Sequence, residues 1–237
     1  MNGELASPAL DTASGMMPSR RALLAGLAAT SALTVAGCAS LPAFSLTEAI
    51  RRLLLLSSRN ALARLMAPGG FWDNQLARLD LPEVFGSRRG GVLERILTGP
   101  AFRSRLQREL NHVAEDGARR AAPVVADAVR VIGVRNAIEL VRGGPSAATA
   151  YLRGEMGSRL VEEMFPALAD GLRVARDPII GEALAALTGV DVPGVARQLA
   201  VQADNAIWSE IGREEAFIRA NPESTNDPML ISVFKVV

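Results

Sequence analysis

Apolar residues recur at helical spacing over most of the chain. In the segment 45–66 they are Ile50, Leu53, Leu54, Leu62 and Leu65, which is the pattern of one helix face. Ser45 and Glu48 have the spacing of a capping box, and Pro68-Gly69-Gly70 ends the pattern. The spacing therefore predicts a helix from Ser45 to shortly before Pro68.

Further stretches carry the same spacing. One stripe consists of Phe102, Leu106, Leu110, Val113 and Gly117, and another of Ala196, Leu199, Ala203, Ile207, Ile211 and Ile218. Proline and glycine residues predict where further helices begin. Pro123 is expected to open a helix that reaches Ile132, and a longer helix is expected after Gly143-Gly144-Pro145, from about Ser146 to Leu172. Pro178 and Pro193 are expected to open two more helices, the second of which ends near Ala220. Residues 77–82 are extended at most, and 83–97 are weakly helical.

Strand signals are missing from this pattern. No alternation of strands with helices and no sustained period of two appears. The fold class expected is all-α, with a single compact multi-helix domain over residues 45–237.

The residues before this domain have the order of an export signal. Arg20 and Arg21 precede an uncharged run of 15 residues, Ala22 to Ala36, which is too short for a stable membrane span and fits a removable signal better. Residues 1–37 are therefore predicted to be a signal peptide, and the arginine pair resembles a twin-arginine signal. Glu4 and Asp11 are unusual in such a segment and favour a start at Met16 or Met17.

Cys38 is the chain's one cysteine, and its neighbours Val35-Ala36-Gly37 resemble a bacterial lipobox. The resemblance implies a diacylglycerol thioether on Cys38, cleavage before it and acylation, for example by palmitate, of the new amino terminus. Residues 38–44 then form a tether that spans at most about 20 Å. Ala39 in place of an aspartate favours the outer membrane over the inner one, so we expect a cell-envelope protein facing the periplasm.

Composition narrows the possible partners. Removal of residues 1–37 leaves a formal charge near +1, which does not favour binding to nucleic acid. With its one thiol committed to lipid, the domain has no internal disulfide, and its stability rests on packing.

Several short blocks, in order, resemble one family. They are Gly69-Gly70-Phe71-Trp72-Asp73-Asn74 with Leu79-Asp80-Leu81-Pro82-Glu83, Leu110-Asn111 with Ala114-Glu115, Ala122-Pro123 with Asp127-Ala128, Gly143-Gly144 with Ala147-Ala148-Thr149 and Tyr151-Leu152-Arg153, and Glu214-Glu215 with Ile218-Arg219 and Asn221-Pro222. The chain resembles the bacterial exported family catalogued as domain of unknown function 4197 from about Leu46 to Phe234. This resemblance implies an exported helical domain and supplies no catalytic residues. Pro145-Ser146 and the segment 189–194 replace acidic residues of the family.

Glu215 is the most interesting chemical group, because it lies on the apolar stripe between Ile211 and Ile218. A buried carboxylate has a raised pKa unless it is paired, and with Asp127 or Tyr151 it would serve as a general base. An ion pair with an arginine of a facing helix is the favoured alternative. Further polar positions of the family pattern would line one cleft, or else cap helices and join them: Asn111, Glu115, Asp127, Tyr151, Arg153.

Other chemistry lacks its usual signatures. His112 has no second histidine or cysteine, no nucleophile or nucleotide motif is present, and Gly143-Gly144 is interpreted as a simple turn. We therefore expect no metal and no cofactor.

The segment 49–66 is basic and amphipathic. It holds four arginines and no acid, so it would either lie on anionic headgroups or pack into the core with its arginines outward. We favour packing.

Three functions remain. The first is a non-enzymatic, lipid-anchored helical domain that binds an envelope protein. The second is a carrier of lipid or another apolar ligand, and the third is an enzyme that uses a buried carboxylate. The sequence leaves the oligomeric state open.

Overall fold

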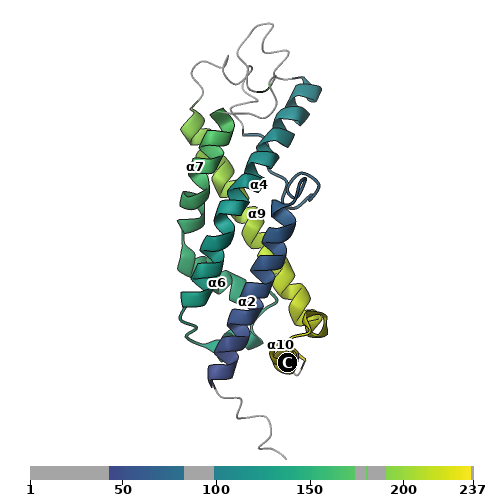
Figure 1. Cartoon of the computed structure of the whole chain (residues 1–237), viewed down its shortest axis with the longest axis vertical. Coiled ribbons are helices and arrows are strands. Elements are labelled where there is room, and N and C mark those ends of the chain that lie inside the picture. The colour runs from purple at the N-terminus through teal and green to yellow at the C-terminus, as the bar shows by residue number, and fades with distance from the viewer. Residues whose placement is uncertain (1–42, 83–98, 174–179, 181–190, 236–237) are drawn as a thin grey trace, which may run out of the picture. The chain divides into compact units, whose positions relative to one another are not determined.

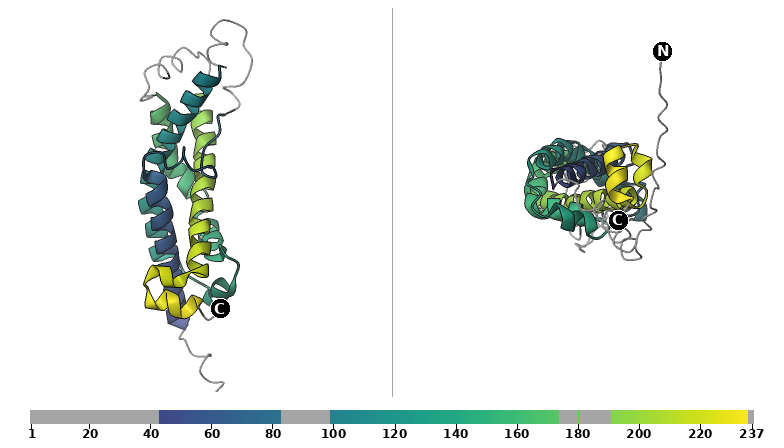
Figure 2. Two further views of the ribbon diagram at one scale, coloured as in Figure 1. Left: turned by 90° about the vertical axis from the view of Figure 1, so that its right-hand side faces the viewer. Right: turned by 90° about the horizontal axis from the view of Figure 1, so that it is seen from below.

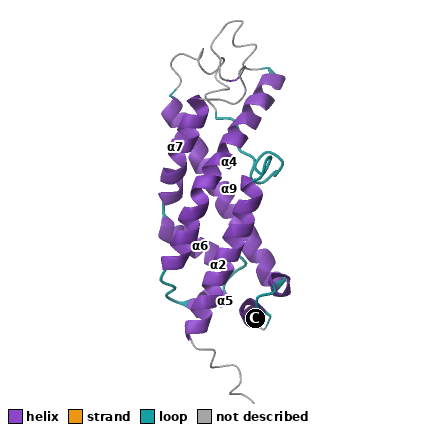
Figure 3. Cartoon of the chain, viewed as in Figure 1, coloured by secondary structure: helices purple, strands orange, loops and turns teal. Residues whose placement is uncertain are grey.

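The computed structural model describes residues 43–82, 99–173, 180 and 191–235. Within these residues all regular secondary structure is helical, which confirms the all-α prediction (Figure 3). The elements are α2 (Ala43–Met66), α4 (Pro100–Val131), α5 (Ala137–Arg142), α6 (Ala147–Met156), α7 (Arg159–Arg173), α9 (Val192–Ala220), the 3-10 helix η2 (Pro222–Thr225) and α10 (Pro228–Phe234).

Four of these helices form an antiparallel bundle. Both α2 and α7 pack against α4 and α9, so the four close a ring around one core (Figures 1 and 2). Two hydrogen bonds show that α2 and α4 run in opposite directions. Arg51 near the start of α2 donates to Ile132 O just beyond the end of α4, whereas Arg119 within α4 donates to Met66 O at the end of α2. The arrangement is that of an up-down-up-down four-helix bundle.

The predicted apolar stripes form the core of this bundle. On α9 all six stripe residues from Ala196 to Ile218 are buried, and on α4 Leu106, Leu110, Val113 and Gly117 are buried while Phe102 is half-buried. On α2, Ile50, Leu53 and Leu54 are fully buried. The basic helix thus packs into the core, as favoured above, and its apolar face is not available to headgroups.

The first helix begins at Ala43 rather than at Ser45, so Ser45 lies inside α2. Its end agrees with the sequence. Met66 is the last helical residue, and Gly69 then takes a left-handed φ of 79°, which favours glycine. A Cβ on Gly70 would lie 2.3 Å from the Arg64 carbonyl oxygen, so the chain turns at a point where only glycine fits.

Pro123 does not open a helix, because α4 runs unbroken from Pro100 to Val131. Proline removes one hydrogen bond and crowds the carbonyl four residues earlier. Pro123 and Arg119, the residue whose carbonyl loses its helix partner, are both exposed, so water can replace the missing donor and the helix continues.

The long helix expected from Ser146 to Leu172 is two helices. Gly157 has a φ of 54° and ends α6, and α7 begins at Arg159. The signal for this break in the sequence is the glycine itself, because glycine within a helical pattern can mark the end of a helix. Together α6 and α7 occupy the third position of the bundle.

Some elements differ from the pattern and some cannot be compared with it. The short helices α5 and α10 were not predicted, since six or seven residues carry too little periodicity. Residues 78–82 form neither helix nor strand. The predicted helical character of 83–97 and the helix start at Pro178 lie outside the described residues, as do Cys38, Arg20 and Arg21.

Candidate functional site

Glu215 joins α9 to the amino terminus of α6. Its side chain is fully buried, and it accepts hydrogen bonds from Ala148 N (3.0 Å), Thr149 N (2.7 Å), Thr149 Oγ1 (2.6 Å) and Arg219 Nε (2.8 Å). The amides at a helix start have no partner within the helix, and the helix dipole favours a negative charge there. Since Ser146 at the N-cap makes no side-chain cap bond, Glu215 caps α6 from another helix.

Arg219 extends this network to two further elements. Its Nη1 and Nη2 donate to the carbonyls of Val141 (2.9 Å) and Leu140 (2.8 Å) at the end of α5, and its Cζ lies 4.8 Å from the ring centroid of Phe234 in α10. Arg219 is on the same helix as Glu215, so the expected partner from a facing helix was wrong. Four residues along a helix place both groups on one face, and from there the pair holds α5, α6 and α10 against α9.

A second polar contact holds the other half of α6. Arg153 Nη2 donates to Asp204 Oδ2 (2.9 Å) and Asn205 Oδ1 (2.5 Å), and Trp208 Nε1 donates to Asp204 Oδ1 (2.8 Å). Burial raises the pKa of Asp204 above its ordinary value, against the opposing effects of Arg153 and the hydrogen bond from Trp208. The cost of burying the charged carboxylate therefore outweighs the stabilisation from Arg153 and Trp208.

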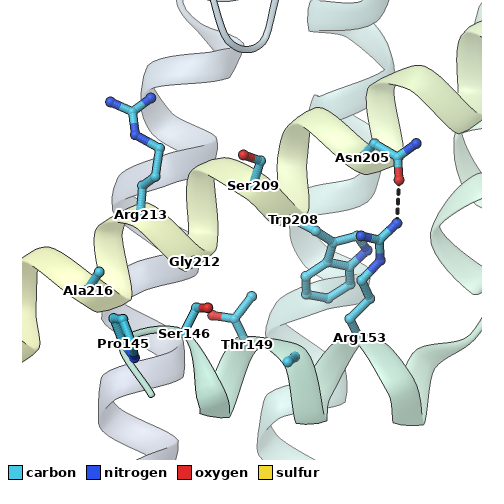
Figure 4. A pocket seen from close by; sticks show the side chains of 11 residues that line it. Pro145, Ser146, Thr149, Arg153, Asn205, Trp208, Ser209, Gly212, Arg213 and Ala216 are labelled. Carbon is cyan, nitrogen blue, oxygen red and sulfur yellow. Dashed lines mark hydrogen bonds between the residues drawn. The ribbon is translucent and has the colours of Figure 1, made fainter.

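Between these two contacts lies a surface groove of about 470 Å³. One wall comes from the turn before α6 and from α6 itself, and the other comes from α9 (Figure 4). The lining consists of Pro145, Ser146, Thr149, Ala150, Arg153, Asn205, Trp208, Ser209, Gly212, Arg213 and Ala216. A Cβ on Gly212 would lie 3.2 Å from Ser146 Cβ, so this glycine lets the walls approach closely at one end.

The comparisons with known proteins decide the family. The model of the family described as protein of unknown function (DUF4197) matches residues 40–235. The chain belongs to this family. No curated protein and no solved structure matches it.

Two polar positions of the DUF4197 pattern hold the loop that follows α2. Asn111 accepts from Leu79 N (2.8 Å) and donates to Leu79 O (3.2 Å) and Gln107 O (2.7 Å), and Glu115 accepts from Gly69 N (2.9 Å). Both side chains are buried, as is Phe71 of the loop. These groups therefore fix residues 69–79 against α4.

The other predicted residues lie apart from one another. Tyr151 Oη donates to Gly133 O (2.6 Å), and exposed Asp127 pairs with Arg130 (2.5 Å) one turn away on α4. Of the residues expected to share a cleft, only Arg153 lines the α6–α9 groove. Among the described residues, neither Asp127 nor Tyr151 forms a hydrogen bond with Glu215.

Sequence reasoning missed Asp204, Trp208 and Arg219. Each has a local signal, because Asp204 precedes Trp208 by four residues and Glu215 precedes Arg219 by four, so each pair shares a helix face. The pairing of Glu215 was therefore readable from the sequence, whereas its contact with α6 was not.

Arg213 also lines a second pocket, of about 450 Å³. Its lining consists of Arg64, Asn74, Glu210, Arg213, Glu214 and Phe217. Here Glu210 pairs with Arg213 (2.6 Å) and Glu214 with Arg64 (2.8 Å). Both acids are already engaged by arginines.

The described part of the chain contains neither a metal-binding cluster nor a membrane-spanning helix. No cluster of three or more histidine, cysteine, aspartate or glutamate side chains there is arranged to hold a metal ion. No helix there combines the length and apolar character that a membrane span requires.

Proposed function

We propose that this DUF4197 protein is a lipid-anchored envelope protein whose helical domain binds a protein partner without catalysis. The partner site proposed is the α6–α9 groove, and the anchor is the lipid on Cys38. The partner expected is an extended, polar segment of another envelope protein.

The observation that carries this proposal is the complete engagement of Glu215. A general base needs a free lone pair within reach of a substrate proton. Glu215 is fully buried and already accepts four hydrogen bonds, three of them from the amino terminus of α6. Its arrangement supports a structural role.

The groove has the features of a site for a peptide segment. Asn205, Ser209 and Arg153 are exposed along it, and Trp208 lies between its walls (Figure 4). Exposed amide, hydroxyl and guanidinium groups bind the backbone and acidic side chains of a partner, whereas Trp208, which is 3% exposed, is a buried part of the lining. The rims of protein-binding sites are polar in the same way.

The binding site is tested by photocrosslinking in the full chain. A photoreactive residue replaces Ala150 or Ser209 in the groove, and the matched control replaces Asp170 of α7, whose side chain is 69% exposed. We expect one discrete crosslinked protein at both groove positions and none at 170. Equal crosslinking at all three positions would contradict a specific site.

A groove-filling variant sharpens this test. Ala150→Phe adds bulk to the α6 wall without removing a hydrogen bond of Glu215 or Arg153, and it should reduce crosslinking from position 209 at least tenfold. Asp170→Phe is the control and should leave it unchanged. If crosslinks are absent and the purified domain instead has an extra mass that is lost on denaturation, the carrier function replaces this one.

The anchor is tested separately by mass and fractionation. The full chain should carry diacylglycerol and acyl groups on Cys38 and sediment with membranes, and Cys38→Ser should abolish both. A wild-type chain that retains residues 1–37 and an unmodified thiol would refute the anchor and leave the groove experiment unaffected.

A further inference from the structure

One end of the bundle gathers α5, the segment 131–136 and the first turns of α2. Arg51 Nη2 donates to Ile132 O (3.3 Å), and α5 packs on α2. Arg52 of α2 also contacts Asp227 at the start of α10 (3.1 Å). We call the end defined by the start of α2, residues 131–142 and the start of α10 the basal end (Figure 1).

Two large apolar side chains are exposed at the basal end. Val131 is 79% exposed, and Ile138, seven residues on, is 55% exposed. Their backbone is held in place, since Ile132 and Val141 beside them are buried in the core and Tyr151 donates to Gly133 O. Their exposure thus belongs to a fixed surface and is not the accident of a loose loop.

Charge around these two residues is nearly balanced. Arg130 pairs with Asp127, and Asn136 Nδ2 donates to Glu139 Oε2 (3.0 Å). Arg135 and Arg142 are the remaining exposed basic residues of the segment. A surface of this kind, apolar with long basic side chains at its edge, suits the boundary between headgroups and acyl chains.

The length of chain before α2 indicates which end meets the membrane. Ala43 is the fifth residue after Cys38, and a chain of that length reaches at most about 20 Å. The opposite end of α4 lies farther away, since Ser104 precedes Val131 by 27 residues, or about 40 Å of helix at about 1.5 Å per residue. A lipid on Cys38 therefore keeps the basal end within reach of the bilayer.

We propose that the basal end, through Val131 and Ile138, inserts into the lipid headgroup region and fixes the orientation of the bundle on the membrane. The occupant of this surface is the bilayer to which Cys38 is anchored, so the inference rests on the anchor of the proposed function. Because the charges nearly cancel, the contact depends on the apolar pair more than on anionic lipid.

The test uses single cysteines in the full lipidated chain. A thioether on Cys38 does not react with a maleimide, so Val131→Cys or Ile138→Cys takes up one fluorophore, and Ser104→Cys at the far end of α4 is the control. The labelled proteins are reconstituted in phosphatidylcholine vesicles with and without quencher-bearing lipid. We expect at least threefold quenching at 131 and 138 and none at 104.

A second experiment places the label on a neighbouring residue, so that the two apolar side chains can be replaced. With the fluorophore at Arg135→Cys, Val131→Ser with Ile138→Ser should reduce quenching at least threefold. The matched control is Val201→Ser, which removes an apolar side chain that is 45% exposed on α9, and it should leave quenching unchanged.

The outcomes separate this inference from the anchor. Quenching that is absent at 131 and 138, or equal at 104, while Cys38 stays blocked overturns the orientation alone. A Cys38 that reacts with the maleimide in the wild-type chain overturns the anchor, and the orientation with it.

Discussion

The bundle contains two seams that are built on different principles. Where α4 meets α7 the contact is apolar and relies on shape: Gly117 faces Met164 and Leu168, and Gly171 faces Val113. Where α6 meets α9 the contact relies on hydrogen bonds from Glu215 and Asp204. The side chains of the first seam are buried, whereas the second seam is flanked by the groove of about 470 Å³.

The difference teaches how a short helix is held. The apolar seam lets side chains interdigitate, which is how long bundle helices gain most of their stability. Helix α6 has only ten residues and so offers little apolar area. Its position depends on Glu215, which binds its amino terminus, and on Asp204, which pairs with Arg153. The groove beside this contact is the site proposed above for a partner.

The largest expected effect comes from Glu215→Gln. Glutamine keeps the size of the side chain but sets an amide donor against the N–H groups of Ala148 and Thr149, and it leaves Arg219, whose side chain is 10% exposed, without its counter-charge. Removing one partner of a buried pair costs about 3–5 kcal/mol. Urea unfolding measures this loss.

Glu214→Gln is the matched control for that substitution. Glu214 precedes Glu215 in the same helix but pairs with Arg64, whose side chain is 52% exposed, and with Asn60. Its loss should be about 1 kcal/mol. Equal losses for the two variants would mean that the contact with α6 has no special weight.

The apolar seam should respond to added bulk with an intermediate effect. In Gly171→Ala the new Cβ would lie 2.4 Å from Val113 Cγ1, and the β-branched valine has little freedom to move away. Overpacking of this kind costs about 1–3 kcal/mol. Thermal unfolding should register the loss.

Gly117→Ala tests the same seam without a clash. The nearest atoms to the new Cβ belong to Met164 at 3.7 Å, which is ordinary contact, and alanine favours helix over glycine by up to about 1 kcal/mol. This variant should be neutral or slightly more stable. A clear loss would indicate that the seam needs glycine for a reason other than space.

The smallest effect expected is a pH dependence due to Asp204. Burial raises the pKa of Asp204 from its ordinary 3.8, so the folded chain keeps a proton that the unfolded chain has already released. Its stabilising contribution is therefore complete below that value and is lost as the pH rises through the folded pKa. In Asp204→Asn this decline should disappear from the free energy of unfolding.

Asp227 supplies the opposite sign for comparison. Burial acts to raise its pKa, but hydrogen bonds from Met229 N and from Arg52 lower the pKa of Asp227 below its ordinary value. Its contribution is present above that ordinary value and is lost as the pH falls through the folded pKa. The free energy of unfolding is measured with urea from about pH 3 to about pH 7. Asp204→Asn should remove a contribution that falls as the pH rises, and Asp227→Asn should remove a contribution that rises with pH.

Apolar periodicity predicted the buried faces of the long helices but not all of their ends. The stripes of α2, α4 and α9 are buried except for the half-buried Phe102, because a face of regularly spaced apolar residues has to be covered. Proline and glycine were harder to interpret. Pro123 lies within α4 at an exposed position, where water can replace the lost hydrogen bond. Gly157 divides the helix that had been expected to continue.

The candidate site divides in the same way. Glu215 stood out because a carboxylate on an apolar stripe needs a partner, and its arginine lies four residues along the same helix. The amides of Ala148 and Thr149 lie 67 and 66 residues away along the chain, and backbone groups leave no mark in a sequence. The same holds for Asn111 and Glu115, which bind the backbone of the loop after α2.

The sequence by itself determined the family, the helical class and the apolar faces of the bundle, because these depend on residue type and on spacing within one helix. Only the tertiary structure decided that Asn111 and Glu115 hold the loop after α2 against α4. It also decided that Glu215 caps α6 and that Arg153 lines a groove. Hydrogen bonds between distant segments depend on where backbone groups meet after folding, and no local pattern encodes that meeting.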